Sequence, residues 1–224
     1  MRWLMGLFSS QSGNGASPAS APSPLQQARD ELRSLAAALV NLPSQERERS
    51  VRDIASIADR QPELGAEVIG VLRGVKDDPV EDVRQSAVIL LGYISERHPA
   101  LQPMVIDALC AISEVSHSYT RHHAINQLSR IGEGRADLAQ LALRALKDVS
   151  SSSGADEGNR VLAINCMGSI AARHQASDFA LTGQALAHFH AASTDRAENV
   201  RRISDEWIGR LKDLPKAGPS DPAP

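Results

Sequence analysis

Apolar residues recur at three- and four-residue steps along most of the chain, which is the pattern of amphipathic helices. The clearest case lies between residues 80 and 94, and its apolar positions are Val80, Val83, Ala87, Leu90, Leu91 and Ile94. A similar stripe occupies residues 62–75, and only the segment 76–79 separates the two. Two amphipathic helices joined by so short a turn are expected to pack antiparallel as a hairpin.

The start of the second helix is marked by Asp78 and Pro79. The Asp78 side chain can accept bonds from backbone N–H groups, and Pro79 has the φ angle of a first helical turn. Glu81 and Asp82 follow, where acidic side chains interact favourably with the helix dipole. The helix is therefore expected to begin at or near Pro79.

An arginine follows soon after this start, and arginines with a similar apolar pattern behind them recur along the chain. They are Arg52, Arg84, Arg121, Arg160 and Arg201, at steps of 32, 37, 39 and 41 residues. Such steps are typical of helical-hairpin repeats. Six residues before the arginine stands an acid in three copies, Glu46, Asp78 and Asp195, whereas Val115 and Gly154 take this place in the others.

With its Asp-Pro turn and a Val-Arg pair early in the second helix, the unit over residues 62–94 resembles a HEAT-type (armadillo-like) repeat. The resemblance extends over roughly residues 25–214 and implies an α-α superhelix. It also implies a ladder of acid–arginine pairs along the turns, interrupted at Val115 and Gly154. We therefore expect a structural role for the ladder residues, which are Glu46, Arg52, Asp78, Arg84, Arg121, Arg160, Asp195 and Arg201.

The periodic pattern predicts an all-α solenoid of about five antiparallel hairpins in a single domain, residues 25–214. The expected helix pairs are 25–42 with 44–60, 62–75 with the helix after Pro79, 101–113 with 117–132, 136–149 with 157–174, and 177–191 with 196–214. Ser44 is the expected N-cap of its helix. Each such hairpin can bury its apolar face only against its neighbours.

Both ends of the chain have a different composition. Met1–Phe8 is a short apolar cluster, and a stretch rich in Ser, Gly, Ala and Pro follows it. We expect disordered tails over residues 1–24 and 215–224. The cluster is too short for a transmembrane helix and only partly matches a signal peptide. It is compatible with a docking motif anchored by Trp3 and Phe8, with weak membrane-surface contact, or with no specific role.

Composition changes this picture little. The net charge of −3 gives no bias toward nucleic acid. Arg outnumbers Lys 20 to 4, a balance that fits a GC-rich bacterial genome. The two cysteines, Cys110 and Cys166, lie inside apolar helical patterns without metal-ligand spacing, so we expect reduced, buried thiols and a cytoplasmic protein.

The sequence contains no glycine-rich phosphate loop and no nucleophile elbow. Its densest polar cluster spans residues 117–123, but the adjacent His122 and His123 would point about 100° apart on a helix and cannot both hold one ion unaided. His188 and His190 likewise lie on different helix faces. We therefore expect no catalytic residue, no cofactor, no metal and no enzymatic activity.

The leading hypothesis is a scaffold or adaptor that binds a protein or peptide on the concave face formed by the second helices. The residues expected on that face are Gln85, Ile89, His122, Asn126 and Arg130. The resemblance leaves an alternative, since HEAT-like arrays include phycobilin lyases and DNA-alkylation-repair glycosylases. A glycosylase needs a basic groove with aromatic side chains, whereas Trp3 and Trp207 lie at opposite ends of this acidic chain. No nucleic-acid partner is expected, and the pattern does not fix the oligomeric state.

Overall fold

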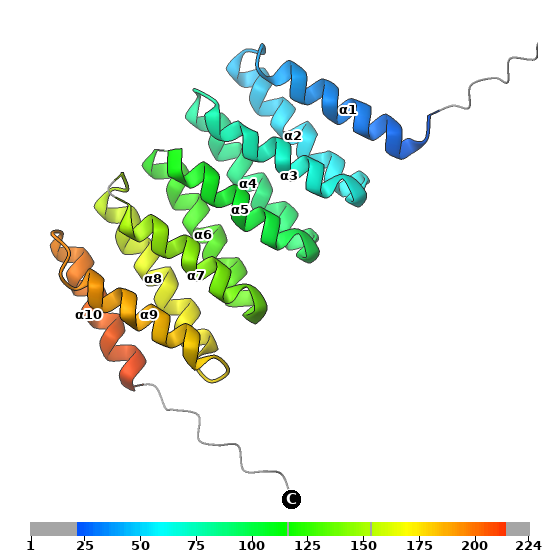
Figure 1. The fold of residues 1–224 in the computed structure, drawn as a ribbon. Helices are drawn as coiled ribbons and strands as arrows, with labels where there is room; N and C mark the ends of the chain where they lie inside the picture. The colour runs from blue at the N-terminus through cyan, green and yellow to red at the C-terminus, as the bar shows by residue number, and fades with distance from the viewer. Residues whose placement is uncertain (1–21, 116, 153, 214–224) are drawn as a thin grey trace, which may run out of the picture.

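The computed structural model describes residues 22–115, 117–152 and 154–213. Within them the chain has ten α-helices and no strand, and the helices form five antiparallel hairpins stacked side by side (Figure 1). The predicted all-α, solenoid-like fold is thus confirmed. Trp3 and Phe8 lie outside the described residues, and the expectations for the two tails stay predictions.

The first helix of each hairpin has an odd number and the second an even number. The odd helices are α1 (Pro24–Leu39), α3 (Gly65–Gly74), α5 (Gln102–Val115), α7 (Ala136–Ser151) and α9 (Phe179–Ala192). The even helices are α2 (Ser44–Arg60), α4 (Glu81–Arg97), α6 (Ser118–Gly134), α8 (Glu157–His174) and α10 (Glu198–Asp213). Single 3-10 turns, Pro62–Leu64, Val75–Asp77 and Pro99–Leu101, flank α3 and precede α5.

The apolar stripes of the helices meet in one continuous core along the array. In α4 the stripe residues Val83, Ala87 and Leu91 are completely buried. Along the array, the even helices pack against one another more closely than the odd helices do. This is the arrangement of a curved array in which the even helices form the tighter inner row, and the odd helices lie in front of them in Figure 1.

Two glycines of the even helices lie directly beneath a side chain of the next even helix. A Cβ atom on Gly92 of α4 would lie 2.5 Å from the side chain of Gln127 in α6, and one on Gly168 of α8 would overlap the ring of Trp207 in α10. A larger residue at Gly92 would therefore require the end of the flexible Gln127 side chain to move, and one at Gly168 would require the whole Trp207 ring to move. In both places a side chain of the following repeat packs directly against the glycine backbone.

Two helix starts differ from the sequence-based expectation. Ser44 is the first residue of α2, not its N-cap, and Pro43 holds the cap position without a side-chain hydrogen bond. Asp78 does accept a backbone N–H, that of Val80, at 2.8 Å, but α4 begins only at Glu81. Pro79 therefore belongs to the turn, because Asp78 closes a small loop around it before the helix starts.

Candidate binding face

Each even helix carries an arginine as its fourth residue, and these arginines are Arg47, Arg84, Arg121, Arg160 and Arg201. Their steps are 37, 37, 39 and 41 residues. The first place in the series therefore belongs to Arg47, where the sequence pattern suggested Arg52. Arg52 lies further along α2, is exposed and pairs with Glu48 at 2.5 Å, and the predicted acid Glu46 is exposed as well.

Three of these arginines join their hairpin to the turn of the next one. Arg47 contacts Asp78 at 2.9 Å, and Arg160 contacts Asp195 at 2.5 Å. Between them, Arg121 donates to the carbonyl oxygen of Gly154 at 2.8 Å, so a backbone acceptor replaces the missing acid there. Arg84 differs, because it bonds within its own hairpin, to Glu81 and to the Asp78 carbonyl.

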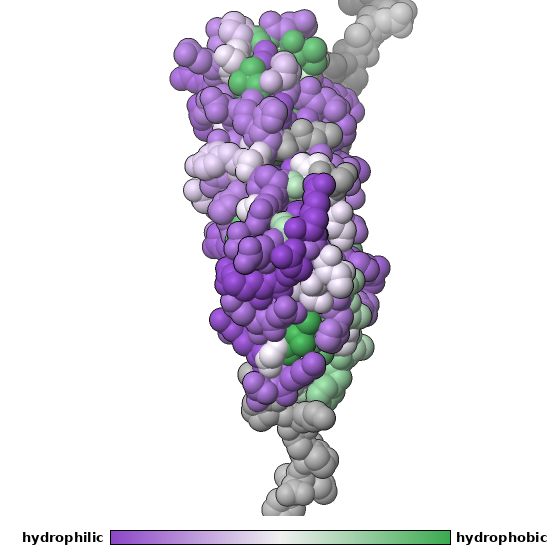
Figure 2. Space-filling model, turned by 90° about the vertical axis from the view of Figure 1, so that its left-hand side faces the viewer, coloured by the Kyte–Doolittle hydropathy of each residue, from purple (hydrophilic) through white to green (hydrophobic). Residues whose placement is uncertain are grey.

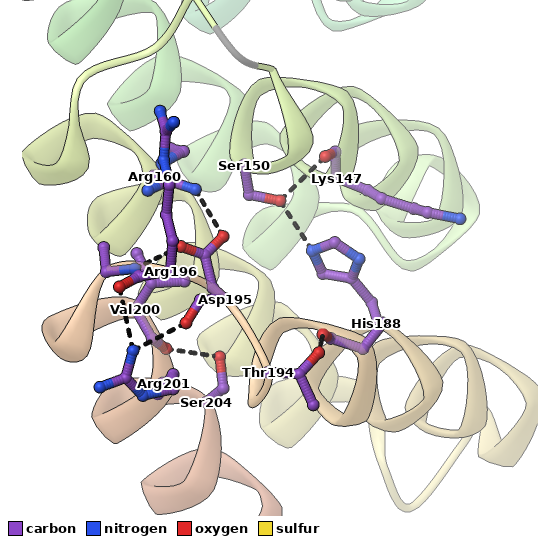
Figure 3. A network of polar contacts seen from close by, with 12 residues as sticks. Lys147, Ser150, Arg160, His188, Thr194, Asp195, Arg196, Val200, Arg201 and Ser204 are labelled. Atoms are coloured by element: carbon purple, nitrogen blue, oxygen red, sulfur yellow. Dashed lines mark hydrogen bonds and ion pairs between the residues drawn. The ribbon is translucent and has the colours of Figure 1, made fainter.

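The last rung shows why these groups have a structural role (Figure 3). Arg201 donates to the carbonyl oxygen of Asp195 at 2.8 Å while the Asp195 carboxylate holds Arg160. Burial opposes ionisation of Asp195, but the N–H of Ala197 and the Arg160 guanidinium outweigh it and lower its pKa. The carboxylate therefore stays charged at neutral pH, and its bonds fix the turn between α9 and α10.

Figure 2 views the edge of the array that carries these turns. It is mostly hydrophilic, with apolar side chains near the top, over the first hairpin, and again in the lower part of the view. A hollow of about 240 Å³ lies between the turns of the first two hairpins, lined by Leu39, Val40, Val75 and Pro79 among others. Val40 is the most exposed apolar side chain there, at 82%.

The even helices have one side that points away from the odd helices, and this side is here called the even-helix face. All five residues expected to bind a partner lie on it. Gln85 and His122 hold equivalent places in α4 and α6, as do Ile89 and Asn126. His122 is exposed, while Gln85, Ile89 and Asn126 are half-buried. Arg130 is exposed but pairs with Glu96 of α4 at 2.6 Å, so part of its charge is already compensated.

Two open grooves cross the even-helix face. The groove between α2 and α4 has a volume of about 260 Å³ and is lined by Arg52, Ser56, Asp59, Leu90, Tyr93 and Arg97 among others. The groove between α6 and α8 has a volume of about 360 Å³, and Ser118, His122, Val161, Leu162 and Asn165 contribute to it. Of the five predicted residues, only His122 is among the side chains that line these two grooves.

The sequence reading missed Tyr93, whose side chain is 56% exposed in the α2–α4 groove. The helical register could have indicated this position, because Tyr93 lies one turn after Ile89 on the same side of α4. It takes the place in α4 that Arg130 takes in α6.

At the other two interfaces between even helices, a side chain of the next helix packs directly on a glycine. Gln127 lies over Gly92 between α4 and α6, and Trp207 lies over Gly168 between α8 and α10. The indole N–H of Trp207 donates to Asn165 at 2.9 Å, and the Arg210 guanidinium lies 5.0 Å from the ring centre. Trp207 is thus packed between repeats, with 8% of its side chain exposed.

One aromatic pair lies at the start of α6. Tyr119 and His123 form an edge-to-face pair with ring centroids 4.7 Å apart. Burial and Asp107 raise the pKa of Cys110 to about 12, and burial raises that of Cys166, so both thiols stay protonated at neutral pH. In residues 22–115, 117–152 and 154–213, no group of three or more His, Cys, Asp or Glu is arranged to hold a metal ion.

Across the same described ranges, none of the helices is both long and apolar enough to cross a membrane. Compared with known protein families and with curated proteins, the sequence matches none. What the fold itself defines is the class: an all-α, solenoid-like array of helical hairpins.

Proposed function

We propose that this chain is a HEAT-type repeat protein that acts as a non-enzymatic scaffold or adaptor and binds a protein or peptide across its even-helix face. The observation that supports this most is the pair of open grooves between α2 and α4 and between α6 and α8. They combine an exposed aromatic ring, Tyr93, with polar groups such as His122 and Asn165. Aromatic side chains in such settings are frequent anchors of protein interfaces.

The spacing of the grooves suits an extended peptide. Neighbouring packed helices lie roughly 10 Å apart, so grooves two helices apart are separated by about 20 Å. An extended chain advances about 3.3 Å per residue, which places two anchor side chains roughly six residues apart. We therefore propose a partner segment with an apolar anchor for the Tyr93 groove and a polar side chain for the His122 groove.

A site-specific crosslinking experiment tests this assignment. A photoreactive residue at Tyr93 or at His122, introduced in the producing cells, is expected to capture the same partner protein. In the purified complex, Tyr93→Ala and the combined change of His122, Asn126 and Arg130 to Ala are each expected to weaken binding about tenfold or more. The reason is that loss of an interface anchor costs about 1.4 kcal/mol or more, and each 1.4 kcal/mol corresponds to a factor of ten.

Met104 and Leu141 supply matched controls, because both are exposed apolar residues on odd helices. Their replacement by Ala is expected to leave the affinity for the captured partner unchanged. Capture from positions 104 and 141 only, or full affinity of the even-face variants, would contradict the proposal.

We also expect no appreciable affinity for DNA or RNA. The net charge is −3, and several arginines of the array are engaged in the ladder by carboxylates and carbonyls. Trp207 is buried against Gly168, so it is not free to stack on a base. Fluorescence anisotropy with labelled oligonucleotides at about 150 mM salt is the measurement. Tight binding with a steep salt dependence would favour a glycosylase-like function instead.

The proposal places the chain in a bacterial cytoplasm, supported by its two unpaired cysteines and its arginine-rich composition. Contact of Met1–Phe8 with a membrane surface belongs to the same set of proposals. Vesicle flotation of the full chain, compared with a chain lacking residues 1–24, tests that contact.

A further inference from the structure

The groove between α7 and α9 lies on the side of the array opposite the even-helix face. These two odd helices pack less closely than α3 with α5 or α5 with α7. A hollow of about 450 Å³ opens between them, and its lining includes Leu143, Arg144, Lys147, Gln184, Ala187 and His188. The proposed function makes no use of this hollow.

His188 is the unusual residue of the groove. Its place in the repeat is taken by Val75, Ile112 and Val149 in the three preceding hairpins, and all three are buried apolar side chains. His188 is almost as buried, with 9% of its surface exposed, yet it is titratable. Replacing an apolar core residue by histidine lowers the stability of the core unless the imidazole forms hydrogen bonds.

The hydrogen bonds of His188 leave one ring nitrogen for a ligand (Figure 3). Its Nε2 lies 2.7 Å from Oγ of Ser150, and that hydroxyl donates its own hydrogen to the Lys147 carbonyl at 2.8 Å. The Nε2–H therefore donates to Oγ, and Nδ1 carries a lone pair. Among the described residues Nδ1 has no hydrogen-bond partner, and it lies on the side of the ring turned away from Ser150.

The charges around the groove are positive. Arg144 and Lys147 stand one turn apart on α7, both exposed and both without an ion pair among the described residues. Asp148 is an acid whose charge acts on His188, but it lines a different hollow together with Cys110. Burial and Lys147 lower the pKa of His188, with Asp148 acting in the opposite direction, so the imidazole is neutral at pH 7.

We propose that this groove is a binding site for a small amphipathic anion, a carboxylate on a short aliphatic body. The carboxylate would lie between Arg144, Lys147 and His188, and the aliphatic part over Leu143, Ala187 and Ala191. The volume falls within the roughly 300–1,000 Å³ of small-molecule sites. From Gln184 to Ala191 the groove extends only about 10 Å, too short to seat an amphipathic partner helix of several turns.

Binding should be linked to a proton. A carboxylate placed against the bare Nδ1 repels its lone pair, whereas a protonated imidazole donates Nδ1–H to it. The bound ligand therefore raises the affinity of His188 for a proton. The positive charges of Lys147 and Arg144 lower this proton affinity, whereas the negative charge of Asp148 raises it. The affinity of the groove for the carboxylate is expected to rise as pH falls from 7.5 to 5.5. At the upper end of this range, binding should be accompanied by uptake of up to one proton by His188.

Isothermal titration of the full chain with decanoate, below its micelle concentration, tests the site. Saturable binding is expected, with decanol at least tenfold weaker because it lacks the charge. Titrations in buffers of different ionisation enthalpy should show proton uptake near pH 7. A dissociation constant weaker than about 1 mM, or equal binding of decanol, overturns the proposal.

Three variants localise the binding. Lys147→Gln is expected to lower the affinity about tenfold, Ala187→Leu to fill the groove and abolish binding, and His188→Val to remove the proton uptake. Ala187 and Lys147 are exposed, so their variants should fold normally. Lys212→Gln on α10 is the matched control and should bind as the parent chain does. If Ala187→Leu leaves the binding of decanoate intact, decanoate binds elsewhere on the protein and the proposal is wrong.

Discussion

Replacing Leu91 by Pro is expected to unfold much more of the array than the hairpin that contains it. Leu91 is completely buried in the middle of α4. Proline there removes an i→i−4 hydrogen bond and clashes with the preceding turn, and the lost leucine leaves a cavity. Together these effects cost about 5 kcal/mol or more, which is comparable with the whole stability of a small domain.

The loss spreads because α4 is packed between α2 and α6, and neither neighbour can bury its apolar face without it. Hydrogen exchange resolved by segment should show lost protection in α2 and α6 as well as in α3 and α4. Ala136→Pro is the matched control, because Ala136 is the exposed first residue of α7, where proline is tolerated. Loss of protection confined to α3 and α4 would contradict the coupling between hairpins.

The helices were predictable because each must bury one stripe of side chains, and a stripe at 3.6-residue spacing is visible in the sequence. The α3 segment shows the limit of this signal. Its apolar residues from Leu64 to Val75 suggested one helix, whereas the structure has α3 between two 3-10 turns. Periodicity tells which residues are buried, and it says less about where the backbone changes its hydrogen-bonding pattern.

The ladder illustrates a second limit. Arg47 and Arg52 both precede apolar residues of α2, and the sequence pattern favoured Arg52. The helix start decides between them, since the ladder arginine is the fourth residue of each even helix. With Ser44 as the N-cap the helix would begin at Gln45, whereas it begins at Ser44 with Pro43 in the cap position, and only from this start is Arg47 the fourth residue.

The grooves could not be predicted, because they depend on pairs of residues about 35–41 positions apart. Whether a gap between two even helices is open or filled is decided by which side chain of the next repeat faces it. Gln127 over Gly92 and Trp207 over Gly168 fill two of the gaps, while Leu90 and Tyr93 leave the α2–α4 groove open. Helix spacing and side-chain direction, rather than local pattern, determine this outcome.

Gly168→Ala is expected to detach the last helix from the array. A methyl group at this position would overlap the six-membered ring of Trp207, which packs α10 against α8. The indole cannot retreat freely, because it donates to Asn165 and is covered by Arg210. Overpacking of this kind costs about 3 kcal/mol, which corresponds to a fall of about 10 °C in Tm for a chain of this length.

The measurement uses Trp207 as its own reporter in a Trp3→Phe background, because the chain contains two tryptophans. Gly168→Ala should shift the Trp207 emission to longer wavelength at a temperature at which most of the helical circular dichroism signal persists. Gly183→Ala in α9 is the matched control, because a Cβ there meets no atom within 4 Å, and it should stabilise the chain by about 0.5–1 kcal/mol. Adding Trp207→Leu to Gly168→Ala should cost less than the sum of the two single changes, because the clash is then relieved. Strict additivity, or an unchanged melting temperature for Gly168→Ala, would show that Trp207 does not pack on Gly168 in solution.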